Sequence, residues 1–213
     1  MALLWIASNN QKKVAELTRI LQPLAIELRT PDRLGAPFAP VEDRPDFAGN
    51  AFVKASLLAK LAGAPALGDD SGLCVDALGG RPGVHSARYG GPGLDDRGRL
   101  LRLLEELRAV PAPARTAHFV CSVCVCGPDG AVLAAIEERC TGTLLTAPAG
   151  EGGFGYDPIF VPTEFGGDPA KTFATLDAAT KDRLSHRGKA LRALASRLPA
   201  LLGREGPRNR PHS

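Results

Sequence analysis

LLWIASNNQKKVAELTRILQP, residues 3–23, carries the two signals that decide the fold class. Its first five residues are wholly apolar, which is typical of a buried strand. Three polar residues at 8–10 then offer helix-capping side chains, and apolar residues keep helical spacing until Pro23 ends the pattern. A buried strand that leads directly into an amphipathic helix predicts an α/β protein.

The rest of the chain continues this alternation. We expect helices over 47–62, 96–108 and 177–198, the first two capped by Asp46 and Asp95, and strands over 25–30, 66–68, 116–126 and 131–141. Gly127-Pro-Asp-Gly130 is a turn sequence, so the last two strands should form a hairpin. The strand at 66–68 should end in a turn at Asp69-Asp-Ser-Gly72, and residues 33–45 are Pro-rich and irregular.

Length and charge narrow the classes of function. The chain has 213 residues and a formal net charge of +3, and residues 203–213 hold three arginines against one glutamate. The near-neutral remainder argues against binding a long polyanion, which needs a basic face. No run approaches 18 apolar residues, so we expect no membrane span and a cytoplasmic protein. Residues 1–200 should form a single domain, and residues 203–213 a disordered polar tail.

Cysteine spacing offers a zinc site as an alternative to a plain strand. Cys121, Cys124 and Cys126 lie within one predicted strand. A zinc site would need a second ligand pair, and none follows at finger-like spacing. Residues three apart in a strand point to opposite faces, so we expect buried thiols that act as small hydrophobic side chains.

Two short segments could bind an anion and a metal. The helix N-terminus after Ser8 exposes N–H groups and carries Lys13, which suits a phosphate, although ordinary capping and a solvated lysine explain it as well. Asp69 and Asp70 are adjacent carboxylates, and a turn needs only one of them. A magnesium ion would explain both, with Glu42 as the nearest further oxygen ligand.

Two later segments have the character of a nucleotide pocket. Five of the aromatic residues fall between 154 and 173, where they form either a core or a wall for a flat base. Residues 181–189 place several polar side chains on one helix, and His186-Arg187 before Gly188 suggests a helix that is interrupted to present them. Asn50 and Lys54 share one face of the helix at 47–62, which is a polar stripe or part of a site.

Read together, these segments resemble the inosine triphosphate pyrophosphatase family, the Ham1-like enzymes that act on non-standard purine nucleotides. The matching stretches follow the family's order: SNNQKK (8–13), FAGNAFVKA (47–55), DDSGLCVDALGGRPGVHSARY (69–89), GGFGYDPIF (152–160) and KDRLSHRGKAL (181–191). The chain departs from the pattern around Glu42, where the family has two consecutive acidic residues and this sequence reads Val41-Glu42.

The resemblance implies a homodimeric, elongated, two-lobed α/β protein with a mixed twisted sheet and a nucleotide cleft between the lobes. It implies Mg²⁺-dependent hydrolysis of ITP, dITP and XTP to the monophosphate and pyrophosphate, which cleans the nucleotide pool. Asp70 would be the proton acceptor beside Asp69, with Lys13 as a further catalytic residue, and Glu42 and Asp70 would bind the metal. The substrate contacts would be Ser8, Asn9, Asn10, Gln11, Lys12, Lys13, Lys54, Ser71, Phe154, Gly155, Tyr156, Asp157, Lys181, His186 and Arg187.

Elementary chemistry agrees with this reading. Water would attack the α-phosphorus, so catalysis depends on positioning and on neutralising spread negative charge. His186 or Arg187 could donate to the 6-oxo group of hypoxanthine or xanthine and leave the 6-amino group of adenine unpaired. Two alternatives stay open: a non-catalytic nucleotide sensor, and a nucleic-acid-binding protein that uses the arginines of the tail.

Overall fold

The computed structural model describes residues 2–203, and its centre is one six-stranded sheet in the order β2-β1-β3-β4-β5-β6. β1 pairs in parallel with both β2 and β3, and the other neighbours are antiparallel. The sheet is therefore mixed. The strands are β1 (Leu3–Ile6), β2 (Glu27–Arg29), β3 (Ala66–Val75), β4 (Thr116–Cys126), β5 (Val132–Leu144) and β6 (Phe160–Pro162).

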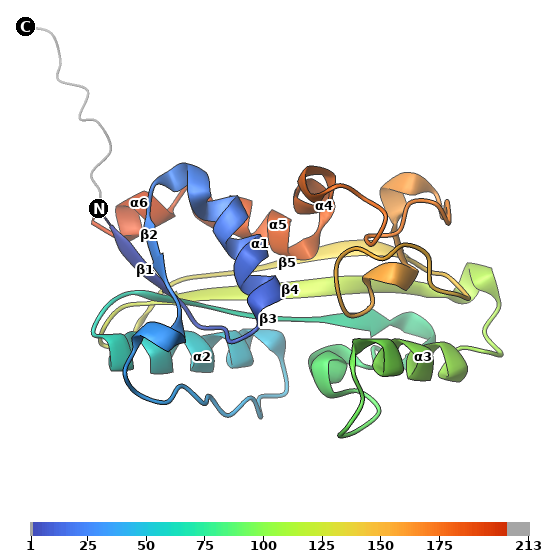
Figure 1. The fold of residues 1–213 in the computed structure, drawn as a ribbon, viewed down its shortest axis with the longest axis horizontal. Helices are drawn as coiled ribbons and strands as arrows, with labels where there is room; N and C mark the ends of the chain where they lie inside the picture. Colours follow the sequence, from blue (N-terminus) through green and yellow to red (C-terminus); the bar gives the residue numbers. More distant parts are fainter. Residues whose placement is uncertain (1, 204–213) are drawn as a thin grey trace, which may run out of the picture.

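Helices cover both faces of this sheet. They are α1 (Gln11–Leu21), α2 (Phe47–Ala62), α3 (Asp96–Glu106), α4 (Ala178–Leu184), α5 (His186–Ala195) and α6 (Leu198–Leu201). Figure 1 shows an elongated molecule in which β3, β4 and β5 follow the long axis, α1, α5 and α6 lie above them, and α2 and α3 lie below. The α/β class, the mixed sheet and the elongated outline are confirmed, and the division into two lobes stays a prediction.

Local sequence signals place most of the elements. Asp46 accepts a hydrogen bond from the N–H of Gly49, and Asp95 accepts one from the N–H of Gly98, so both act as the predicted helix caps. α1 ends at Leu21, immediately before a short 3₁₀ turn that contains Pro23. The hairpin of β4 and β5 also forms where the Gly-Pro-Asp-Gly turn predicts it.

The prediction for β3 is wrong at its end. The strand does not stop at Gly68 but continues through Asp69 and Asp70 to Val75, paired with β4 along its whole length. Turn-forming residue types were outweighed by strand pairing. Cationic side chains from helices on both faces of the sheet make the buried carboxylates tolerable in a strand.

The predicted helix over 177–198 is divided into α4, α5 and α6. The first break lies at Ser185, whose extended backbone ends α4 and whose side chain caps α5 through the N–H of Gly188. Gly188 itself lies inside α5 and is not the point of interruption. A Cβ atom there would meet the carbonyl oxygen of Asp182, so glycine allows the end of α4 to pack closely on α5.

The cysteines are structural, as the strand pattern predicts. All five are free thiols, and four of them are buried. Cys121 lies in the apolar cluster with Leu17 and Leu191, whereas Cys124 lies in the cluster of α2 on the opposite face. Two thiols three residues apart in β4 therefore diverge and cannot share a metal ion.

Two further sequence predictions concern the whole chain. Among residues 2–203, no helix is both long enough and apolar enough to cross a membrane. The tail predicted at 203–213 lies, from residue 204 onward, outside the described residues. The single domain over 1–200 stays a prediction.

Candidate functional site

A cavity of about 500 Å³ opens beside β3, where the parallel strand β1 comes to an end. Ala7 makes the last contact on this edge, donating its N–H to the carbonyl of Leu67 at 2.7 Å. Further along, the edge is closed by Ser86, whose hydroxyl accepts the N–H of Leu73 at 2.9 Å. Asp70, Ser71 and Gly72 border the cavity between these two contacts. The short length of β1 thus leaves room for a ligand beside the sheet.

Asp69 and Asp70 point to opposite faces of β3, because successive residues of a strand alternate. Asp69 contacts Lys13 of α1 and Arg187 of α5, and Asp70 contacts Asn50 and Lys54 of α2. The idea that one cation explains both carboxylates is therefore wrong. Of these two carboxylates, Asp70 lines the cavity and Asp69 does not.

Asp69 belongs to a buried ionic cluster under the cavity floor. Its Oδ2 atom lies 3.1 Å from Lys13 Nζ and 3.4 Å from Arg187 Nη2. Burial opposes the charged form, but Lys13, Arg187 and Lys54 outweigh it and hold the pKa of Asp69 well below its usual range. Arg187 also donates to Glu16 at 2.5 Å and to Ser71 at 2.8 Å, so four of its N–H groups have partners. The cluster fixes α1 and α5 against β3.

Asp70 has the opposite character. Burial raises the pKa of Asp70, and attraction to Lys54 and Lys13 does not cancel this effect. Asn50 donates to Asp70 Oδ2 at 3.1 Å, and Lys54 donates to Asp70 Oδ1 at 3.0 Å and to Glu42 Oε2 at 2.9 Å. Glu42 comes from the irregular segment before α2 and also lines the cavity.

Glu42 and Asp70 fit the expected magnesium ion. Both are carboxylates that line the same cavity and converge on the same point, the ammonium of Lys54. Within residues 2–203, no three His, Cys, Asp or Glu side chains are close enough together to hold an ion by themselves. Mg²⁺ commonly binds through one or two carboxylates and completes its shell with water and substrate phosphate, so two carboxylates suffice.

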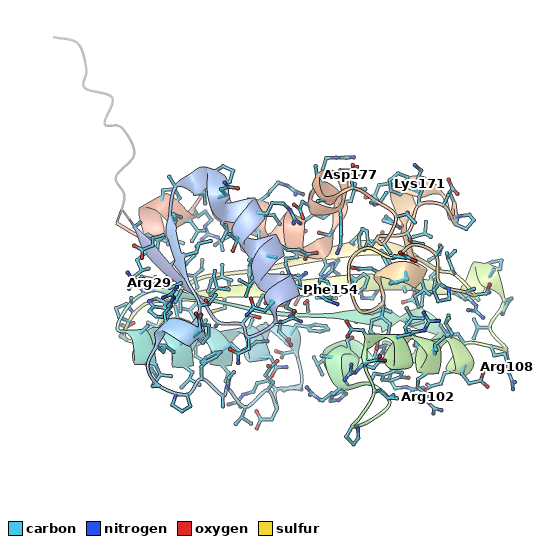
Figure 2. All side chains as sticks on the ribbon, in the orientation of Figure 1. Arg29, Arg102, Arg108, Phe154, Lys171 and Asp177 are labelled. Atoms are coloured by element: carbon cyan, nitrogen blue, oxygen red, sulfur yellow. The ribbon has the colours of Figure 1, made fainter. Side chains whose placement is uncertain are left out.

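The opposite wall of the cavity combines aromatic rings with buried charge. Lys181 donates to Glu16 at 2.7 Å and to Asp157 at 2.8 Å, and its ammonium lies 5.0 Å from the ring centre of Phe154. The centre of the Phe154 ring also lies 5.9 Å from Lys12 Nζ. Figure 2 shows Phe154 beside the N-terminal end of α1. This ring is held in place by cations and remains partly exposed to the cavity.

His186 lines the cavity as a neutral imidazole. Its ring stacks on Phe119 with centres 4.7 Å apart, and its Nδ1 atom is buried without a partner among the described residues. Burial and the neighbouring cations, Arg187 first, hold the pKa of His186 well below its usual range. A buried nitrogen with no partner beside a cavity is suited to a polar group of a ligand.

Comparison with known proteins identifies the family of this chain. The Ham1 family model matches residues 4–197. The chain belongs to the Ham1 family. A dITP/XTP pyrophosphatase from Thermus thermophilus is 49% identical over 192 residues, covering 89% of this chain and 88% of the relative. One from Desulfotalea psychrophila is 44% identical over 197 residues, 92% and 85% of the two chains.

Solved Ham1 structures have the same fold. A HAM1 protein from Coxiella burnetii superposes with a TM-score of 0.81 at 36% identity, over 94% of this chain and all of that chain. The Ham1 protein from Staphylococcus aureus gives 0.80 at 34% identity, over 93% and 98% of the two chains. The likeness covers more than nine-tenths of this chain in both comparisons.

The structure brings most of the predicted Ham1 site residues together and leaves out three. Gln11, Lys12 and Asp69 do not line the cavity, and Lys12 Nζ instead lies 3.5 Å from Asp96 Oδ2. The predicted residues that line it are Ser8, Asn9, Asn10, Lys13, Glu42, Lys54, Asp70, Ser71, Phe154, Gly155, Tyr156, Asp157, Lys181, His186 and Arg187.

The N-terminus of α1 is less open to an anion than the sequence suggests. Asn10 caps the helix and accepts the N–H groups of Lys12 and Lys13. Lys13 is not solvated, because it pairs with Asp69. At this end of the Ham1 cavity, the cation of Lys13 therefore has a better-defined role than the helix N–H groups.

Several cavity residues were missed by the sequence reasoning. Glu16 lies one turn after Lys13 on α1 and holds both Lys181 and Arg187, which are more than 160 residues away in the chain. The one signal for Glu16 in the sequence is its own charge on the inner face of α1. Other missed residues include Ser86 and Arg88, which lie within the stretch 69–89 but were given no role there, and Phe38, Asp96, Arg99 and Phe119, which lie outside the matching stretches.

Proposed function

We propose that this chain hydrolyses dITP, ITP and XTP to the nucleoside monophosphate and pyrophosphate, and so removes deaminated purines before they enter DNA or RNA. The names of its relatives support this, because those that share 42–49% of its sequence are dITP/XTP pyrophosphatases. The cavity supports it as well, since it is lined by cations, by aromatic rings and by carboxylates that include Glu42 and Asp70.

The observation that carries the proposal is the position of Asp70 in the cavity. Asp70 is a buried carboxylate that lines the cavity beside Lys54, where it can accept a proton from a water molecule. Asp70 would take a proton from water as the water oxygen bonds to the α-phosphorus. The bond from that phosphorus to the bridging oxygen breaks, and pyrophosphate leaves with the bonding electrons.

Charge neutralisation would come from both sides of β3. Lys13 and Lys54 line the cavity near the expected triphosphate, and each is held by a carboxylate that keeps it in place. We propose Mg²⁺ as the cofactor, with Glu42 and Asp70 as its ligands. When bound, it would supply positive charge to the phosphate oxygens.

Choice of base would depend on the opposite wall. Phe154 and Tyr156 would border a flat purine, and His186 would lie at its polar edge. The N–H of a neutral imidazole can donate to a 6-oxo group but finds no acceptor in a 6-amino group. Because most donors of Arg187 already have partners, His186 is the better candidate for this contact.

One assay tests the proposal against both alternatives. Purified protein is incubated with Mg²⁺ and, separately, with ITP, dITP, XTP, GTP and ATP, and pyrophosphate is measured. We expect release from the first three and little from the last two. Tight binding without release would favour a nucleotide sensor, and strongly salt-dependent binding to DNA would favour a nucleic-acid-binding protein.

The resemblance also leads us to propose a homodimer, which analytical ultracentrifugation would test. A cytoplasmic location likewise stays a prediction, to be tested by cell fractionation.

A further inference from the structure

Lys54 already occupies the two carboxylates that are expected to bind magnesium. Its ammonium lies 2.9 Å from Glu42 Oε2 and 3.0 Å from Asp70 Oδ1. The second oxygen of Asp70 accepts a hydrogen bond from Asn50. The Lys54 side chain is only 7% exposed, so water cannot readily replace these carboxylates as its partners.

The fold holds this arrangement from three directions. Asn50 and Lys54 lie one turn apart on α2 and face β3, which carries Asp70. Glu42 lies in an irregular segment, and its carbonyl oxygen accepts a hydrogen bond from Arg88 at 3.3 Å. The same segment is tied to α2 where the N–H of Arg44 donates to the side chain of Asn50. The contact of Lys54 with both carboxylates is therefore a built feature and not a chance approach of a mobile lysine.

This geometry sets two cations in competition for the same oxygens. A magnesium ion that arrives alone meets the positive charge of Lys54 at the point where it would bind. It also brings no negative group to replace the carboxylates around a buried ammonium, which would be left unpaired. A magnesium–triphosphate complex differs, because its phosphate oxygens can accept the ammonium as the carboxylates turn to the metal.

We propose that Lys54 excludes free Mg²⁺ from Glu42 and Asp70, and releases these carboxylates only to a metal–triphosphate complex. The exclusion of the free ion rests on the residues alone, whereas the exchange of partners rests on the proposed function. Lys54 is thus a gatekeeper for the metal as well as a cation of the triphosphate site. The order of binding follows: the metal enters with the nucleotide.

Calorimetric titration with Mg²⁺ alone, without nucleotide, tests the exclusion. Lys54→Gln removes the charge and keeps a hydrogen-bond donor for Asp70, and Lys54→Arg is the matched control that keeps the charge. We expect Lys54→Gln to bind Mg²⁺ at least about ten-fold more tightly than the wild type, because a like charge has been removed. Lys54→Arg should stay within about two-fold of the wild type, since its charge is unchanged.

A double variant locates the effect. In Lys54→Gln combined with Glu42→Gln, the gain in Mg²⁺ affinity should disappear, because one of the two carboxylates is gone. A folded Lys54→Gln protein that binds Mg²⁺ no more tightly than the wild type would overturn the proposal. Thermal unfolding of each variant establishes that it is folded.

The wild-type protein gives a second readout that needs no variant to fold. The side-chain ammonium resonance of Lys54 can be followed by NMR with ¹⁵N-labelled lysine. Mg²⁺ alone should leave this resonance in place, and Mg²⁺ with a non-hydrolysable dITP analogue should shift it. A shift with Mg²⁺ alone would also overturn the proposal.

These measurements separate the inference from the proposed function. If the wild type releases no pyrophosphate but Lys54→Gln binds Mg²⁺ more tightly, the proposed function fails and the exclusion of free metal stands. If pyrophosphate is released and Lys54→Gln shows no gain, the function stands and the exclusion fails.

Discussion

Two neighbouring residues, Asp69 and Asp70, show how strongly the surroundings decide the role of a carboxylate. Asp69 is buried against Lys13 and Arg187, which hold its pKa low, whereas burial raises the pKa of Asp70 beside Lys54. Ionisation of a carboxylate with a lowered pKa stabilises the fold, whereas ionisation of one with a raised pKa opposes it. The first is suited to structure and the second to proton transfer.

We therefore expect the two asparagine variants to fail in different ways. Asp70→Asn should lose less unfolding free energy than Asp69→Asn, because Lys54 keeps Glu42 as a partner, and should lose roughly 100-fold or more in pyrophosphate release, as removal of a general base does. Asp69→Asn should lose about 3–5 kcal/mol of unfolding free energy, because Lys13 and Arg187 are left without their shared partner. Urea denaturation and the pyrophosphate assay on both proteins measure this. Near-wild-type turnover in Asp70→Asn would refute its role as proton acceptor.

His186 gives a prediction for the dependence of stability on pH. Its pKa is well below 6.5 in the folded protein, so below about pH 6.5 the unfolded chain binds a proton that the folded chain does not. The stability that the neutral imidazole provides is therefore present above pH 6.5 and lost as the pH falls. One such proton corresponds to a slope of about 1.4 kcal/mol per pH unit.

His186→Phe is the matched variant, because it keeps a ring to stack on Phe119 and removes the titration. Urea denaturation at pH 7, 6 and 5 should show a steeper fall for the wild type than for His186→Phe. Parallel curves for the two proteins would contradict the assignment of a buried neutral imidazole.

The position of α2 on the sheet depends on Gly68 of β3, which has no side chain to hold the helix away. A Cβ atom on Gly68 of β3 would meet the carbonyl oxygen of Ala51 and lie 2.8 Å from the N atom of Ala55. These are backbone atoms of α2 and cannot move without moving the helix. Since α2 carries Asn50 and Lys54, the distance between this helix and β3 also sets the geometry around Asp70.

Gly68→Ala should therefore affect stability and activity together. We expect a loss of about 1–3 kcal/mol in unfolding free energy from the forced separation of helix and strand. Turnover of dITP should fall as well, although Gly68 itself does not line the cavity. An alanine variant with unchanged urea midpoint and unchanged turnover would show that α2 adjusts freely.

The elements also show what could be predicted from the sequence and what could not. α2, α3 and the hairpin of β4 and β5 follow from caps and turn residues within a few positions, so their prediction succeeded. The extension of β3 through Asp69 and Asp70 depends on Lys13 and Lys54, which are distant in the chain, and local turn preference gave the wrong end. Glu16 was missed for the same reason.

On the scale of the whole molecule, the cavity joins segments that lie far apart in the chain. It is lined by residues 8–10 and Lys13, by Phe38 to Pro40 with Glu42, and by Phe154 to Asp157. Two contacts also join distant segments through residues that line it: Lys12 pairs with Asp96, and Arg88 donates to the carbonyl of Glu42. A bound nucleotide should therefore act on several elements at once.

Hydrogen exchange with a non-hydrolysable dITP analogue and Mg²⁺ tests this. We expect slower exchange in all three segments together, and no change in the outer part of β5 near Val132, which does not border the cavity. At about 100 times its Kd, the analogue should also raise the unfolding free energy by about 2.7 kcal/mol. Protection limited to one segment would contradict a single shared site.

The buried thiols of β4 and β5 have a practical consequence. Burial raises the pKa values of Cys121 and Cys140 to about 12, so neither carries appreciable thiolate at neutral pH. A disulfide reagent reacts with thiolate that it can reach, and both requirements are met only when the sheet opens. The rate of labelling at Cys121 and Cys140, followed separately from the half-buried Cys74, therefore reports the opening of β4 and β5 without any introduced probe. Nucleotide binding to the cavity should slow this modification in proportion to the stability that it adds.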